Sequence, residues 1–247
     1  MQNAECGIKT RNHQSAIYTP KSAFDMTQVI ACFTREGIAL ATDSRATWFD
    51  QTGEMRHFNL KKLLRLGSHS AMISAGAGIG VEMGLAFQQF LQRQGEEDID
   101  QIVRPALPFF TEQYGKWLRS REIKHPPFQT EPEAPLPFTG VYFILAGYSF
   151  RDRTQPFHLH LLGSGEDGIS IKIYPTSHII LIPRSLSMER RLEAQCEGGS
   201  SLNQLLSLCK SFLRKRSAEE EEIGPPFHFA TITPVGFKEI MDKEVEG

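Results

Sequence analysis

Four short apolar runs near the start of the chain constrain its fold more than any other feature. Residues 28–34 and 37–43 are rich in β-branched and small apolar side chains, and they flank a turn at Arg35-Glu36-Gly37. Residues 62–67 and 70–76 repeat this arrangement. Each pair predicts a β-hairpin, because strand-length runs on either side of a short turn favour antiparallel pairing.

Helical periodicity begins after the second hairpin. Apolar residues recur at helical spacing between Gly78 and Gly95, which predicts one helix. Asp98 is a candidate N-cap for a second helix. Pro105 and Pro108 lie within the apolar stripe of that second helix, so it is expected to be kinked or to begin later.

The rest of the chain alternates between strands, loops and one more helix. Residues 48–60 are expected to form a polar connection, and the proline-rich residues 125–137 an extended surface loop. A helix is expected at 201–216 and a last hairpin between Phe227 and Ile240. Strands of a second sheet are expected at residues 139–148, 157–163, 169–174 and 178–183. This order predicts an α+β fold with two antiparallel sheets between helix layers.

Composition excludes several classes of protein. The 247 residues carry a formal net charge of −2, which leaves no excess positive charge for binding nucleic acid or a membrane surface. No apolar run approaches the ~18 residues that span a bilayer. The four cysteines are scattered and contain no CxxC pair, so neither a disulfide framework nor a zinc site is indicated. We therefore expect a cytoplasmic protein with no metal and no cofactor.

A threonine and three later elements stand in a fixed order across the two hairpins. Thr27 precedes the first strand, and the run Asp43-Ser44-Arg45-Ala46-Thr47 begins sixteen residues later. Lys61-Lys62-Leu63-Leu64 opens the second hairpin, and Gly76 closes it fourteen residues after Lys62. This order resembles the start of a proteasome β-type subunit, as in proteasome core particles and bacterial proteasome-like proteins. The resemblance covers roughly residues 27–240 and is strongest up to about residue 92.

The resemblance implies both a fold and an activity. Proteasome β-type subunits are N-terminal-nucleophile hydrolases, whose fold is a four-layer αββα sandwich of two antiparallel sheets between helix layers. Residues 27–247 would form one such domain, and residues 1–26 would be an N-terminal extension or propeptide. The activity would be that of a threonine-type endopeptidase, which hydrolyses peptide bonds in a self-assembled ring.

The roles of the site residues follow from the chemistry of such enzymes. A threonine hydroxyl is a weak nucleophile, but a chain that begins at threonine carries its own base, the free α-amine. The resemblance assigns the nucleophile to Thr27, tuning of the pKa values to Lys62, and anchoring of that lysine to Asp43. The Gly76 N–H would bind the oxyanion. Arg45 belongs to the run Asp43-Ser44-Arg45-Ala46-Thr47, and the resemblance places it among the catalytic residues as well.

Three departures from the family pattern bear on activity. Gln28 stands where a small residue usually follows the nucleophile, and Met26 stands where self-processing subunits carry glycine. Thr27 would become the first residue either by trimming of Met26 as a start residue or by removal of a 26-residue propeptide. The late aspartate and serine of the family have no clear counterpart, although Glu221 is a candidate for the aspartate.

The resemblance also implies partners and a substrate pocket. Thr47, Trp48 and Phe58 fall where the family lines the pocket for the side chain before the cut, and their chemistry favours an apolar side chain. These residues would alternatively pack a contact between subunits. The expected partners are further copies of this chain in a closed ring, peptide or unfolded-protein substrates, and an ATPase unfoldase.

Other interpretations remain open from the sequence. The main alternative is a catalytically inactive structural subunit with the same fold. Residues 75–80 weakly resemble a dinucleotide-binding turn, but no parallel βαβ unit follows. His158 and His160 fall on one strand face, as metal ligands do, without an apparent third ligand.

Overall fold

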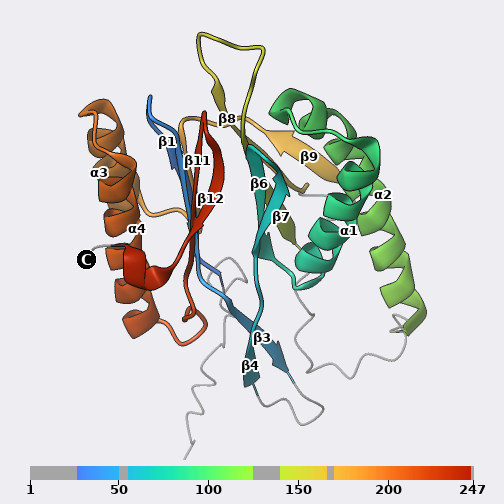
Figure 1. Ribbon diagram of the computed structural model, residues 1–247. Coiled ribbons are helices and arrows are strands. Elements are labelled where there is room, and N and C mark those ends of the chain that lie inside the picture. The colour runs from blue at the N-terminus through green and yellow to red at the C-terminus, as the bar shows by residue number, and fades with distance from the viewer. Residues whose placement is uncertain (1–26, 50–54, 125–139, 166–169, 246–247) are drawn as a thin grey trace, which may run out of the picture.

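The computed structural model describes residues 27–49, 55–124, 140–165 and 170–245. The described residues form an α+β structure in which three sheets are antiparallel, so the predicted fold class is confirmed at that level (Figure 1). Residues 1–26 and the whole of the predicted loop at 125–137 lie outside the described residues. The α-helices are α1 (Ile79–Gln94), α2 (Ile99–Lys124), α3 (Leu186–Glu197) and α4 (Leu202–Glu219).

The first sheet has the strand order β10-β1-β2-β11-β12. The predicted hairpin at 28–43 is confirmed, because β1 and β2 pair with Val29 opposite Thr42. The predicted last hairpin is confirmed as well, with Phe229 opposite Ile240. The strands are β1 (Val29–Phe33), β2 (Ile38–Thr42), β10 (Ile179–Ile182), β11 (His228–Thr233) and β12 (Gly236–Ile240).

The second sheet has the order β5-β6-β7-β8-β9 and contains the predicted second hairpin. Its strands are β5 (Leu63–Gly67), β6 (Ser70–Gly76), β7 (Val141–Tyr148), β8 (Phe157–Ser164) and β9 (Ile171–Tyr174). The prediction that residues 178–183 join this sheet is wrong, because β10 pairs with β1 of the first sheet. The reason is that β10 is an unbroken apolar run, whose burial does not reveal which sheet it joins.

Two further elements differ from the sequence prediction. Residues 48–60 are not all connection, because β3 (Arg45–Phe49) and β4 (Met55–Asn59) form a separate two-stranded ribbon. Figure 1 shows this ribbon extending away from the two larger sheets. Helix α3 was not predicted: apart from its buried residues Met188 and Leu192, most of its face is charged or polar.

The described residues form three apolar cores, one between the two large sheets and one on the outer face of each. One core lies between the two large sheets and includes Val29 and Ala31 of β1. The alternate β1 residues Ile30 and Cys32 face the helices α3 and α4. A third core packs α1 and α2 on the second sheet. The helix pairs therefore cover the outer faces of the two sheets (Figure 1).

The two prolines of α2 do not delay its start. The helix begins at Ile99, and the Asp98 carbonyl accepts the Ile102 N–H at 3.0 Å. Both Pro105 and Pro108 lie inside the helix, so of the two predicted alternatives, a kink or a later start, the later start is wrong. Burial of the apolar stripe stabilises the helix in spite of the two prolines, since Phe110 is fully buried. Within the described residues, no helix has the length and apolar character needed to cross a membrane.

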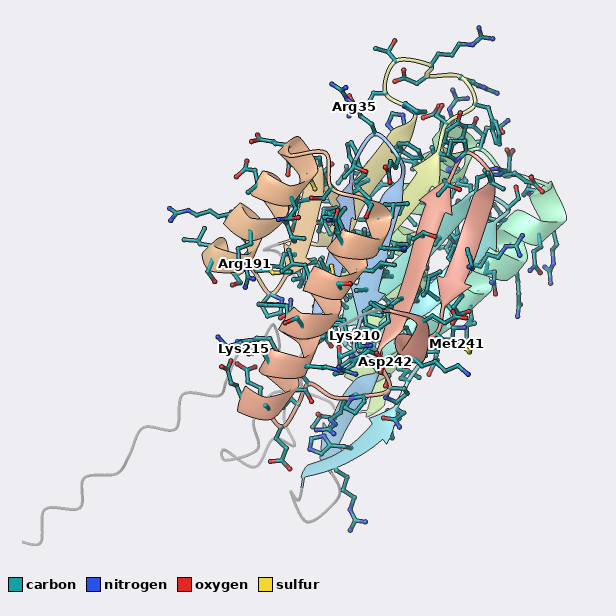
Figure 2. All side chains as sticks on the ribbon, turned by 60° about the vertical axis from the view of Figure 1, so that its left-hand side comes forward. Arg35, Arg191, Lys210, Lys215, Met241 and Asp242 are labelled. Atoms are coloured by element: carbon teal, nitrogen blue, oxygen red, sulfur yellow. The ribbon has the colours of Figure 1, made fainter. Side chains whose placement is uncertain are left out.

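The C-terminal segment is attached to α4 by a buried lysine. Lys210 donates to the Asp242 carbonyl at 2.6 Å and to the Val245 carbonyl at 2.5 Å. Figure 2 shows Lys210 and Asp242 side by side between α4 and the short 3₁₀ helix Asp242–Glu244. These bonds satisfy a charge that is only 5% exposed.

Candidate active site

The two predicted hairpins bring the candidate residues to one place. Thr27 precedes β1 and Asp43 follows β2, so antiparallel pairing sets the two ends side by side. The Asp43 N–H donates to the Gln28 carbonyl at 3.2 Å, which extends this pairing beyond the strands. Lys62 stands directly before β5, at the start of the second sheet. The site therefore lies where the ends of strands from both sheets meet.

Lys62 is the centre of the cluster. Its Nζ donates to Thr27 Oγ1 at 3.1 Å, to Asp43 Oδ1 at 2.9 Å and to the Arg45 carbonyl at 2.7 Å. An ammonium has three N–H donors, and all three have acceptors here. Thr27 and Lys62 are each 4% exposed and Asp43 is fully buried. The ammonium is therefore held in one orientation against the threonine hydroxyl.

Asp43 is fixed by the backbone as well as by Lys62. Its Oδ1 accepts the Gln28 N–H at 2.9 Å, and its Oδ2 accepts the Arg45 N–H at 2.9 Å. Charge-assisted bonds of this kind are among the stronger hydrogen bonds in proteins. The carboxylate thus has little freedom to move away from the lysine.

Burial disfavours the charged forms of both Lys62 and Asp43. Burial lowers the pKa of the Lys62 ammonium, and the Asp43 carboxylate partly offsets that effect. Burial likewise raises the pKa of Asp43, against the opposing effects of Lys62 and of the two backbone N–H donors. The charge of an ammonium held beside a hydroxyl favours loss of the hydroxyl proton.

Arg45 contributes to the cluster through its backbone rather than its side chain. Its N–H and carbonyl bind Asp43 and Lys62, whereas its guanidinium donates to the Glu221 carbonyl. The guanidinium also lies directly over Gly224, where an added Cβ would overlap it. The Gly224 carbonyl accepts the Ser44 N–H at 3.2 Å. The segment after α4 is therefore attached to the two residues that follow Asp43.

Gly76 lies at the end of β6, in the strand next to Lys62. The Lys62 carbonyl accepts the Ser74 N–H at 3.1 Å, and Gly76 follows two residues later. Gly76 has φ of 88°, in the left-handed region that favours glycine. The structure thus places Gly76 close to Lys62 along the second sheet, at a position where the backbone turns.

The predicted pocket residues are not brought together on one face. Thr47 pairs with His57 and Ala46 pairs with Phe58 across the β3–β4 ribbon. Because side chains alternate along a strand, Thr47 and Phe58 lie on opposite faces. Thr47 Oγ1 lies 3.0 Å from His57 Nδ1, and Phe58 is 46% exposed. Trp48 belongs to the same ribbon and pairs with Arg56.

Sequence reasoning missed two residues and overvalued one. The Gln28 side chain is buried and donates to the Ile182 carbonyl at 3.2 Å, joining the start of β1 to β10. A glutamine directly before a wholly apolar strand is expected to be buried, and a buried amide needs a hydrogen-bond partner. Gly224 was not a candidate, because its closeness to Arg45 depends on the tertiary structure. Glu221 was a candidate to orient the threonine amine, but its side chain is 71% exposed and lies 3.6 Å from His57.

Two comparisons with known proteins identify no family for the chain. A scan of models of protein families found no match, and a search of curated proteins found none either. In the described part of the chain, no three histidine, cysteine, aspartate or glutamate side chains are arranged to hold a metal ion.

Proposed function

We propose that the chain is a threonine-type peptidase in which Thr27, once it is the first residue, attacks peptide bonds. One observation supports this most strongly. Lys62 Nζ lies 3.1 Å from Thr27 Oγ1 and 2.9 Å from Asp43 Oδ1 in a nearly solvent-free cluster. A buried lysine needs an anionic partner to offset the cost of burying its charge, and Asp43 supplies that partner. The additional contact of Lys62 with the Thr27 hydroxyl is what a lysine that activates a nucleophile requires.

The proposed reaction uses this geometry directly. Thr27 Oγ1 attacks the scissile carbonyl carbon while its proton passes to the free α-amine of the same residue. The α-amine then protonates the leaving amine, and water hydrolyses the resulting ester. Lys62 stays protonated and lowers the pKa of both groups by its charge. Gly76 supplies an N–H for the oxyanion.

The wider assignment rests on the same resemblance to proteasome β-type subunits. The helix pairs on the outer faces of two packed sheets support the proposal of a four-layer αββα sandwich as in N-terminal-nucleophile hydrolases. The proposal includes a closed homo-oligomeric ring in the cytoplasm, peptide or unfolded-protein substrates, and an ATPase unfoldase as partner. The aromatic pocket is proposed on the Phe58 face of the ribbon alone, since Thr47 lies on the other face.

The test needs a chain whose first residue is Thr27. Such a chain is obtained by starting translation at Met26, because methionine is trimmed before small residues, and its N-terminus is checked by intact mass. We expect it to cleave peptides from an unbiased library. Thr27→Ala should lower kcat/KM by roughly a thousandfold or more, as loss of a catalytic nucleophile does. Retention of full turnover in Thr27→Ala would overturn the proposal.

A matched pair of lysine variants tests the role of the cluster. Lys62→Met keeps the length of the side chain but removes the ammonium beside Thr27 Oγ1. Lys61→Met removes the neighbouring ammonium, which instead pairs with Glu239 at the surface. We expect Lys62→Met to lose turnover and Lys61→Met to keep it. Equal loss in the two variants would contradict a specific role for Lys62.

A catalytically inactive structural subunit is the second candidate. The observation that favours it is that Thr27 is only 4% exposed in the full-length chain, where its nitrogen is also an amide. Thr27 would then be an ordinary buried residue before β1. The candidates are distinguished by the chain that begins at Thr27: no cleavage of any peptide favours the structural subunit.

A further inference from the structure

The β3–β4 ribbon belongs to neither of the two large sheets. Among the described strands, β3 and β4 pair with each other alone, and the ribbon extends away from the sheets (Figure 1). At its base the Leu60 N–H donates to the Ser44 carbonyl at 2.7 Å. A two-stranded ribbon by itself is only marginally stable in water. Side-chain contacts therefore have to help set the direction in which the ribbon points.

The two faces of the ribbon carry different side chains. Side chains alternate along a strand, and residues paired across two strands share a face. Arg45 is two residues before Thr47, and Thr47 pairs with His57, so these three side chains lie on one face. Phe58 follows His57 on β4 and lies on the opposite face, where it is 46% exposed. A contact with the Arg45 face therefore leaves the Phe58 face open to a ligand.

Glu221 contacts both strands of the ribbon on the Arg45 face. The Arg45 guanidinium on β3 donates to the Glu221 carbonyl. On β4, His57 Nε2 lies 3.6 Å from Glu221 Oε1. His57 Nδ1 lies 3.0 Å from Thr47 Oγ1, and when that hydroxyl donates to Nδ1, Nε2 carries a proton that faces the carboxylate. One residue thus holds β3 through its backbone and β4 through its side chain.

The segment that carries Glu221 is fixed by burial and by hydrogen bonds. Directly after α4, the Ile223 N–H donates to the Glu220 carbonyl at 3.2 Å, and Ile223 is fully buried. The Gly224 carbonyl accepts the Ser44 N–H at 3.2 Å, at the base of the ribbon. The position of Glu221 is therefore set by the main body of the protein, and the ribbon is held against it.

We propose that Glu221 is a positioning residue for the substrate: by holding the Arg45 face of the ribbon, it presents the Phe58 face to the apolar side chain that precedes the cut. Glu221 acts through the ribbon, not on the reacting atoms and not on the threonine amine. The role in substrate binding rests on the proposed hydrolysis, whereas the attachment of the ribbon does not.

The expected effect is small, because the Glu221 side chain is 71% exposed. Loss of an exposed ion pair changes an equilibrium by no more than about fivefold. Glu221→Gln removes the charge that faces His57. Glu221→Lys also adds repulsion of the Arg45 guanidinium, so it is the stronger perturbation and the variant of choice.

The first measurement is hydrogen exchange of the full chain, read by mass spectrometry, which needs no hydrolysis. We expect Glu221→Lys to raise the exchange rates in β3 and β4 by about fivefold or more and to leave β1 and β2 unchanged. Glu219→Lys is the matched control, because Glu219 belongs to the same acidic run but pairs with Lys215 on α4. Adding His57→Glu to Glu221→Lys should restore slow exchange, since the attraction returns with the signs reversed.

The second measurement uses the chain that begins at Thr27 and peptides with an apolar residue before the cut. Glu221→Lys should raise KM by about fivefold and change kcat little, since the ribbon contacts substrate and carries none of the reacting groups. Glu219→Lys should leave both values unchanged. A general loss of structure would instead lower kcat, so the split between KM and kcat separates positioning from misfolding.

Each outcome decides a different part of the proposal. Unchanged exchange in Glu221→Lys, or no restoration by His57→Glu, would overturn it. Faster exchange with an unchanged KM would overturn the role in substrate binding and leave the proposed hydrolysis intact. If the parent chain cleaves no peptide, the hydrolysis and the substrate role fail together, and exchange still decides whether Glu221 holds the ribbon. If Glu221→Lys does not fold, as judged by circular dichroism, Glu221→Gln should show the same changes at smaller size.

Discussion

Lys61 and Lys62 are consecutive in the chain, yet they make ion pairs of opposite character. Lys61 Nζ lies 2.8 Å from Glu239 Oε1, and Lys62 Nζ lies 2.9 Å from Asp43 Oδ1. The distances hardly differ. Exposure does: the side chains of the first pair are 50% and 44% exposed, and those of the second are 5% and 0% exposed.

The comparison shows that burial, not distance, distinguishes the Lys62–Asp43 pair from the Lys61–Glu239 pair at the surface. Water and salt screen the Lys61–Glu239 pair, so it contributes little to stability. Around Lys62 and Asp43 the cost of removing charge from water has to be offset by hydrogen bonds, and every donor of the ammonium has an acceptor. The same environment shifts the pKa values of both groups.

The most direct way to break this comparison is to remove each ammonium in turn. Lys62→Met leaves Asp43 buried without its cation, which should lower the free energy of unfolding by about 3–5 kcal/mol. Lys61→Met should lower it by less than about 1 kcal/mol, because its partner returns to water. Urea denaturation at pH 7 measures both values. Equal losses in the two variants would show that burial does not distinguish the pairs.

A substitution at Gly224 tests whether the bond between the Arg45 guanidinium and the Glu221 carbonyl stabilises the region of the buried Lys62–Asp43 pair. A Cβ at this position would overlap the Arg45 guanidinium, which would have to move and lose its bond to the Glu221 carbonyl. We expect Gly224→Ala to cost about 1–2 kcal/mol in urea denaturation. Gly78→Ala is the control, because a Cβ there meets no atom within 4 Å and should cost almost nothing.

A double variant separates this contact from a general effect on the segment. If the overlap with Arg45 causes the loss, Gly224→Ala should cost nothing more once Arg45→Ala has removed the guanidinium. Full additivity of the two substitutions would show that Gly224 is needed for another reason.

His228 gives the smallest expected effect. Its Nδ1 lies 3.9 Å from Glu239 Oε1, and it pairs across the sheet with Thr42, the residue before Asp43. Burial, followed by the charge of Lys61, lowers the pKa of His228. The unfolded chain then binds a proton more readily than the folded chain, so this contribution to stability is present above a pH of about 6.5 and is lost as the pH falls through the folded-state pKa. His228→Gln should flatten the fall in stability between neutral and mildly acidic pH. Identical slopes in the two proteins would contradict this.

The sequence predicted the parts of the fold that local pattern determines. Both early hairpins have turns flanked by apolar runs, and the array of Thr27, Asp43 and Lys62 follows once those hairpins pair. The partner of β10 could not be predicted, because its apolar run suits either sheet. Helix α3 was missed because it buries only a narrow stripe.

The parts of the site that were missed depend on contacts distant in sequence. Gly224 contacts the Arg45 guanidinium only because the segment after α4 lies beside Arg45 in the folded chain. The position of Glu221 beside His57 depends on the β3–β4 ribbon, which the polar composition of residues 48–60 concealed. Residue types suggested these roles, but only the tertiary structure decides which atoms meet.

The central claim is that Thr27 is a nucleophile activated within a buried cluster. The most direct measurement is the intact mass of the chain that begins at Thr27 after treatment with a β-lactone, whose ring a hydroxyl opens without a leaving group. We predict one adduct with the full mass of the lactone on Thr27, formed slowly in Lys62→Met and not at all in Thr27→Ala. Absence of an adduct, or an equal adduct in Thr27→Ala, would contradict the claim.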